Sequence, residues 1–88
     1  MKNVELLQKA IDVARLTREE AAEIMNITRN TLYRWLTGKP VRYRLSEQFA
    51  VFQAKKIIKA VELGLLPLPP GYVDKVHEIN NIIKGIKA

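Results

Sequence analysis

The sequence predicts an all-α fold, a compact bundle of about five helices in a chain of 88 residues. Three observations predict it. Apolar residues recur three and four positions apart in several segments, as on the buried face of a helix. Residues that favour helix N-termini precede several of these segments. Asparagine, glycine and proline separate them, and these residues end helices.

The first two helices are expected before residue 26. Asn3 caps the first, which runs from Val4 to Arg15 and buries a stripe of apolar side chains, namely Val4, Leu7, Ile11 and Ala14. Thr17 begins a capping box with Glu20, because its hydroxyl accepts from the backbone of Glu20 while that carboxylate reaches back. A second helix from Arg18 to Met25 follows.

Three more helices are expected in the rest of the chain. Asn26 tolerates the left-handed conformation of a tight turn, and Thr28 caps a third helix that ends near Gly38, before Pro40. The fourth runs from Leu45 to about Leu63, capped near Ser46 and ended by Gly64. The prolines of residues 66–71 interrupt the helix pattern before a fifth helix, Val73 to Ile86.

Composition narrows the class of protein. Hydrophobic residues make up 48% of the chain and there is no cysteine, which excludes disulfides and thiolate metal sites. No apolar run approaches the roughly 18 residues of a membrane span, and the N-terminus has polar residues where a signal peptide is apolar. We expect a cytoplasmic protein that does not enter a membrane.

The net charge of +6 is concentrated in one third of the chain. Residues 29–59 carry eight basic side chains against Glu47 alone, whereas residues 1–28 total −1 and residues 60–88 are balanced. Localised positive charge of this kind attracts polyanions. A basic face without a partner is the alternative.

Residues 17–38 have the spacing of two short helices that cross steeply at a tight turn. Ala21 and Ala22 provide the small contact between the helices. Apolar side chains on either side of the turn fill the angle, namely Met25, Ile27, Leu32 and Trp35. We therefore expect Trp35 in the core rather than on a surface that stacks with bases.

This segment resembles the helix-turn-helix of the Cro and phage-repressor type, and secondarily the short motif of excisionase-like proteins. The resemblance covers about 22 residues directly, and about 60 with the flanking helices. Asn26 stands where the family usually has glycine, and the proline-broken C-terminal extension departs from the pattern. The resemblance implies a DNA-binding domain over residues 1–66, followed by a linker and helix over residues 67–88. It also implies that the protein regulates transcription by binding double-stranded DNA in a sequence-specific way, as a repressor that occupies operator DNA. A phage or plasmid source is implied by the resemblance only.

Recognition by this motif would use the third helix, whose N-terminal part lies in the major groove. The side chains expected to read bases are Arg29, Asn30, Tyr33 and Arg34. Those expected to contact phosphates are Thr17, Arg18, Thr28, Thr37, Lys39, Arg42, Tyr43 and Arg44. Lys55, Lys56 and Lys59 either extend this surface or form a solvated helix face.

The last helix carries an apolar seam with spacings of four and three, formed by Tyr72, Val76, Ile79, Ile83 and Ile86. Such a seam either packs on its own domain or pairs with a second copy. A homodimer would read half-sites roughly 34 Å apart.

Catalysis is not expected. His77 is the only histidine, the four glycines stand singly, and no clustered carboxylates suggest a nuclease. No cofactor, metal or small-molecule ligand is expected. Two alternatives remain: an excisionase-like factor that bends DNA, and a protein-interaction module that uses the last helix without binding DNA.

Overall fold

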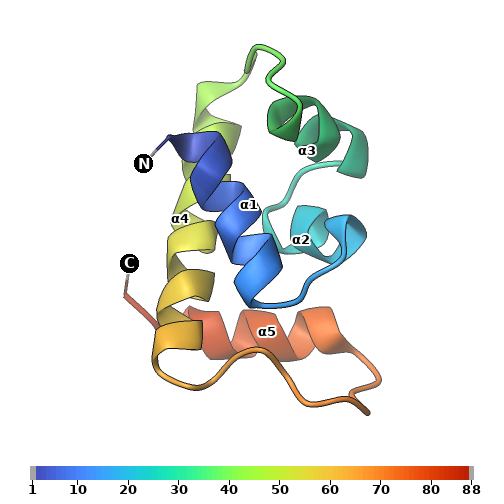
Figure 1. Ribbon diagram of the computed structural model, residues 1–88, viewed down its shortest axis with the longest axis vertical. Coiled ribbons are helices and arrows are strands. Elements are labelled where there is room, and N and C mark those ends of the chain that lie inside the picture. Colours follow the sequence, from blue (N-terminus) through green and yellow to red (C-terminus); the bar gives the residue numbers. More distant parts are fainter. Residues whose placement is uncertain (1, 88) are drawn as a thin grey trace.

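The computed structural model describes residues 2–87, and its five helices confirm the all-α prediction (Figure 1). The helices are α1 (Asn3–Val13), α2 (Arg18–Ile24), α3 (Arg29–Leu36), α4 (Arg44–Glu62) and α5 (Lys75–Lys84). The long α4 and α1 lie beside each other, α2 and α3 pack on one side of this pair, and α5 crosses one end (Figure 1). The described part measures 35 × 24 × 18 Å.

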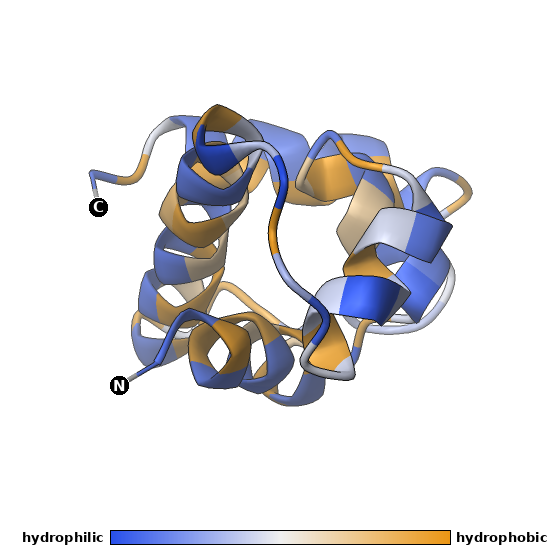
Figure 2. Cartoon of the chain, turned by 90° about the horizontal axis from the view of Figure 1, so that it is seen from above, coloured by the Kyte–Doolittle hydropathy of each residue, from blue (hydrophilic) through white to orange (hydrophobic). Residues whose placement is uncertain are grey.

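One core joins all five helices, because each helix contributes buried apolar residues to it. Figure 2 shows hydrophobic and hydrophilic residues interspersed along the helices. The largest fully buried side chains of the core are Leu7, Met25, Leu32, Ile57, Ile79 and Ile83. Three alanines of α4, Ala50, Ala54 and Ala60, are completely buried. Small side chains at these positions allow neighbouring helices to approach α4 closely. No polar or charged residue is buried within residues 2–87.

The predicted caps of α2 and α3 are confirmed. The backbone N–H of Glu20 donates to the Thr17 hydroxyl at 3.1 Å, and that of Thr17 donates to the Glu20 carboxylate at 2.8 Å. Thr28 accepts from the backbone N–H of Thr31 at 3.1 Å. Asn26 between them has φ 59°, the left-handed conformation expected of it. The chain therefore turns sharply from α2 into α3 at a position that asparagine tolerates.

The predicted start and end of α1 are wrong. The helix begins at Asn3, so Asn3 is not its cap; the preceding Lys2 has its N–H bonded to the Glu5 carboxylate at 3.4 Å. It ends at Val13, because Arg15 adopts a left-handed φ of 53° and Leu16 donates its N–H to the carbonyl of Ile11. This geometry closes the helix in the way that glycine usually does.

The predicted cap of α4 is also wrong, because the helix begins at Arg44 and Ser46 lies in its first turn. Tyr43 is the N-cap residue and its side chain makes no capping hydrogen bond. The last helix, α5, is shorter than expected: Asp74 caps it through a 3.0 Å bond from the backbone N–H of His77. Val73 therefore precedes the helix and Ile86 follows it.

Candidate functional site

Two hydrogen-bonded contacts fix α2 relative to the rest of the fold. Gln53 of α4 donates through its amide to the carbonyl of Ile24, at 3.1 Å. The Lys75 ammonium of α5 donates to the carbonyl of Arg15 at 2.9 Å and pairs with Glu20 at 3.3 Å. Burial raises the pKa of Glu20, but the hydrogen bond from Thr17 and the contacts with Lys75 lower it more, so the pKa lies below its usual value. Both ends of α2 are thus held, the C-terminal end by α4 and the N-terminal end by α5.

The turn between α2 and α3 is filled as the sequence predicts. Ala21, Met25 and Leu32 have no exposed surface, and Trp35 is 6% exposed. Trp35 is therefore a core residue, and its ring is not a stacking surface. Because these side chains occupy the inner angle, the opposite faces of α2 and α3 point to solvent.

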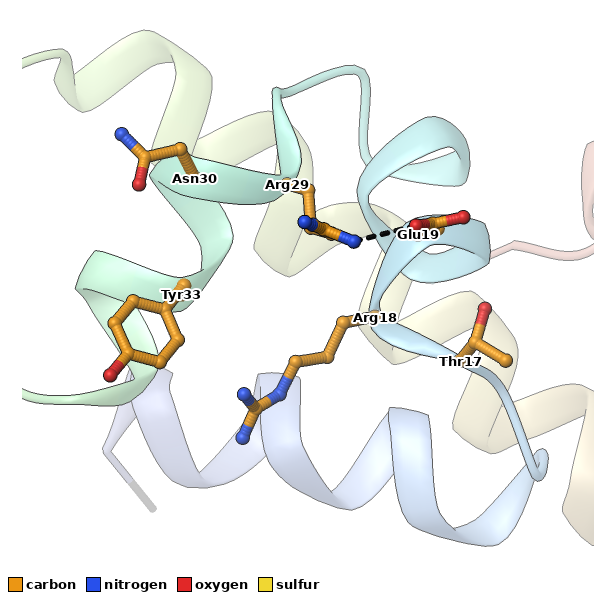
Figure 3. Close-up of a pocket in the computed structure, with 6 residues that line it drawn as sticks. All are labelled: Thr17, Arg18, Glu19, Arg29, Asn30 and Tyr33. Carbon is orange, nitrogen blue, oxygen red and sulfur yellow. Dashed lines mark hydrogen bonds and ion pairs between the residues drawn. The ribbon is translucent and has the colours of Figure 1, made fainter.

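An open hollow of about 720 Å³ lies between the outer faces of α2 and α3 (Figure 3). We call it the α2–α3 hollow; its lining residues are Thr17, Arg18, Glu19, Arg29, Asn30 and Tyr33. Five of these six were predicted from the sequence as DNA contacts. The helix crossing therefore brings together residues of two helices that begin eleven positions apart in the chain.

Two interactions cross the α2–α3 hollow. The Arg29 guanidinium donates to the Glu19 carboxylate at 2.6 Å, and both side chains are largely exposed (66% and 72%). The Arg18 guanidinium lies 5.5 Å from the centroid of the Tyr33 ring. Figure 3 shows Arg29 directed toward Glu19, while Asn30 points away from this pair. Charged and amide groups thus line a space open to solvent.

Glu19 is the residue of this hollow that the sequence interpretation did not include. Its sequence context is that of an ordinary helix-surface charge, and contact with a polyanion needs no carboxylate. Its pairing with Arg29 depends on the angle between α2 and α3, and no local pattern encodes that angle. The only sequence signal is that the first turns of the two helices carry opposite charges, Glu19 in α2 and Arg29 in α3.

A second, smaller hollow lies on the other flank of α3, against the loop of residues 37–43. We call it the α3–loop hollow; its lining residues are Asn30, Thr31, Arg34, Trp35, Pro40, Arg42 and Tyr43. Asn30 borders both hollows. The predicted base-reading residues are therefore divided, with Arg29 and Tyr33 on one flank of α3 and Arg34 on the other.

The other predicted phosphate contacts differ in whether their polar groups already have hydrogen-bond partners within the protein. The Thr28 hydroxyl is used by the cap, since it accepts from the Thr31 N–H and donates to the Thr31 hydroxyl at 2.8 Å. The Thr37 hydroxyl donates back to the carbonyls of Tyr33 and Arg34, both at 3.0 Å. Lys39 and Arg44 are exposed but line neither hollow.

The predicted seam of the last helix is divided between core and surface. Ile79, Ile83 and Ile86 are buried in the core of this chain, at 0%, 2% and 9% exposure, and Val76 packs against that core. Tyr72 is 46% exposed. Of the two interpretations offered for the seam, packing on its own domain accounts for these isoleucines.

Three further observations concern other kinds of site. Within residues 2–87 no three His, Asp or Glu side chains are placed to hold a metal ion. None of the helices in that range has both the length and the apolar character needed to cross a bilayer. No family model matches the chain, and no curated protein or solved structure is significantly similar to it.

Proposed function

We propose that this protein is a sequence-specific double-stranded DNA-binding regulator of transcription, with α3 as the helix that enters the major groove. The observation that carries the proposal is the α2–α3 hollow. It gathers Arg18, Arg29, Asn30 and Tyr33 on the solvent face of two helices joined by a tight turn. The chain's excess positive charge also begins at α3.

The chemistry of these side chains fits the edges of base pairs. Asparagine pairs bidentately with adenine and arginine with guanine, and each such pair contributes about 1–3 kcal/mol of discrimination. Arg18 opens α2, the helix that crosses the DNA backbone in this kind of motif. Arg42 and Tyr43 flank α3 on the side of the α3–loop hollow, where phosphate contact would add affinity without reading sequence.

We further propose that two copies bind one inverted repeat and that occupancy of the site represses transcription. The isoleucines of α5 support the core of each copy, so the pairing would use another surface. The exposed Tyr72 and Val73, just before α5, remain available for it.

Selection of bound sequences from random duplex DNA at about 0.15 M salt tests the proposal, because weak surface attraction is screened there. An enriched inverted repeat is the expected result. A single unrepeated site would contradict pairing of two copies and would favour the excisionase-like alternative. Recovery of unenriched DNA would refute sequence-specific binding.

Substitutions then test the residues. On the selected site, Asn30→Ala and Arg29→Ala are each expected to weaken binding by about 1–3 kcal/mol and to relax the preference at one base position. Lys84→Ala is the control matched in charge to Arg29→Ala, since Lys84 is exposed at the end of α5. Equal effects of Arg29→Ala and Lys84→Ala would show that only net charge matters.

A further inference from the structure

A third concave surface lies between α1 and α4, and it shares no residue with the α2–α3 hollow. We call it the basic groove. Four lysines surround its main part of about 410 Å³, namely Lys9, Lys55, Lys59 and Lys87, above Leu6 and Ile58. Among residues 2–87, Glu62 is the only carboxylate that lines it. The groove therefore combines positive charge with an apolar floor.

The lysines of the groove are free to meet a ligand. All four are exposed, whereas Leu6 and Ile58 are half-buried between the helices. Within residues 2–87 none of the four takes part in an ion pair, because the two pairs found there join Arg29 to Glu19 and Lys75 to Glu20. Their charge is not neutralised by neighbours in that part of the chain.

The groove is long enough for several turns of a helix. At Lys55 it continues into a neighbouring hollow lined by Asn3, Gln48, Val51 and Phe52. From Gln48 to Glu62 the axis of α4 advances about 21 Å, at about 1.5 Å per residue. A bound helix of the same length has about 14 residues.

We propose that the basic groove binds an acidic amphipathic helix of a partner protein. The apolar face of such a helix would cover Leu6, Ile58 and Phe52, and its carboxylates would meet Lys9, Lys55 and Lys59. Helix-in-groove recognition uses this combination of apolar anchors and charged margins. A DNA backbone is a poorer fit, since its phosphates would leave the apolar floor uncovered. The proposal does not depend on the DNA-binding role, because the two surfaces are separate.

The probe is a labelled 15-residue peptide of leucine and glutamate in an amphipathic helical pattern. Its controls are a scrambled peptide of the same composition and the same pattern with lysine in place of glutamate. We expect the first peptide alone to bind the protein, with amide shift changes in α1 and α4. No preference over the scrambled control, or shift changes centred on the α2–α3 hollow, would overturn the proposal.

Matched variants test the charge of the groove. Lys59→Glu is expected to weaken peptide binding about tenfold at low salt, and less as salt screens the interaction. Lys84→Glu makes the same charge change outside the groove and is expected to leave the affinity nearly unchanged. Equal losses in both variants would overturn the proposal. So would a Lys59→Glu variant that loses duplex DNA binding but keeps peptide binding, because the groove would then belong to the DNA surface.

Discussion

The substitution Ile79→Ala tests whether α5 is an integral part of the domain. Ile79 has no exposed surface and lies in the core that joins all five helices. The change removes three carbon atoms, worth about 2.4 kcal/mol of transfer free energy at about 0.8 kcal/mol each. The cavity left behind raises the expected loss to about 3–4 kcal/mol. A domain of this size has a total stability of about 4–13 kcal/mol, so the loss is a large fraction of it.

Urea and thermal unfolding followed by circular dichroism measure this effect. A loss of about 3 kcal/mol lowers the Tm by about 12 °C or more in a domain of this size. Val73→Ala is the control: Val73 lies just before α5 and is fully exposed, so its change is expected to stay within about 0.5 kcal/mol. If both variants lose equally little, α5 is not held by its own chain and our reasoning is refuted.

Substitutions at three positions test the α2–α3 unit. Asn26→Gly should change the free energy of unfolding by less than about 0.5 kcal/mol, whereas Asn26→Ala should lower it by about 1 kcal/mol, because the φ of residue 26 is 59°. Equal free energies of unfolding for the two variants in urea titration would contradict the role of that conformation. Glu20→Gln should destabilise the protein at neutral pH. Because the pKa of Glu20 is lower in the folded protein than its ordinary 4.5, the carboxylate stabilises the fold above pH 4.5 and this contribution is lost as the pH falls through the folded pKa. The free energies of unfolding of the variant and the parent should therefore converge in acid. A difference between them that is constant with pH would argue against this role of the Glu20 carboxylate. Glu19→Gln should tighten binding to duplex DNA of any sequence and reduce the preference for the selected site. The control Glu23→Gln, at an exposed residue of the same helix outside the hollow, should do neither. Filter binding to the selected duplex and to random duplexes measures both effects for the two variants.

The sequence predicted best those features that depend on local chemistry. The Thr17–Glu20 capping box, the Thr28 cap and the left-handed Asn26 each involve residues at most three positions apart, and all three occur as predicted. The starts of α1 and α4 were predicted wrongly because neither N-cap residue, Lys2 or Tyr43, makes a capping hydrogen bond through its side chain. Packing sets those boundaries, and the apolar period alone locates them only approximately.

The candidate site was predictable in its members but not in its arrangement. Helical spacing indicates that Arg29, Asn30 and Tyr33 share the solvent side of one helix. It does not indicate that Arg34 lies in a separate hollow, or that Glu19 reaches Arg29. Both depend on how α3 sits between α2 and the following loop. The seam of α5 likewise has the same period whether it packs internally or against another copy, and only burial distinguishes the two.

The ion pair between Arg29 and Glu19 has a consequence for how the proposed recognition would discriminate between bases. Both side chains are mostly exposed, so breaking the pair costs little, of order 1 kcal/mol or less for pairs of this kind. Arg29 would leave Glu19 only for an acceptor that offers more. A guanine offers two acceptors to one guanidinium, and that bidentate contact exceeds the cost of breaking the pair. At a base that offers no such contact, Arg29 would stay with Glu19, so its charge would be neutralised and would not attract the phosphates of that sequence. Glu19 would thus weaken binding to every sequence but least to the correct one, which is how a repulsive group increases specificity.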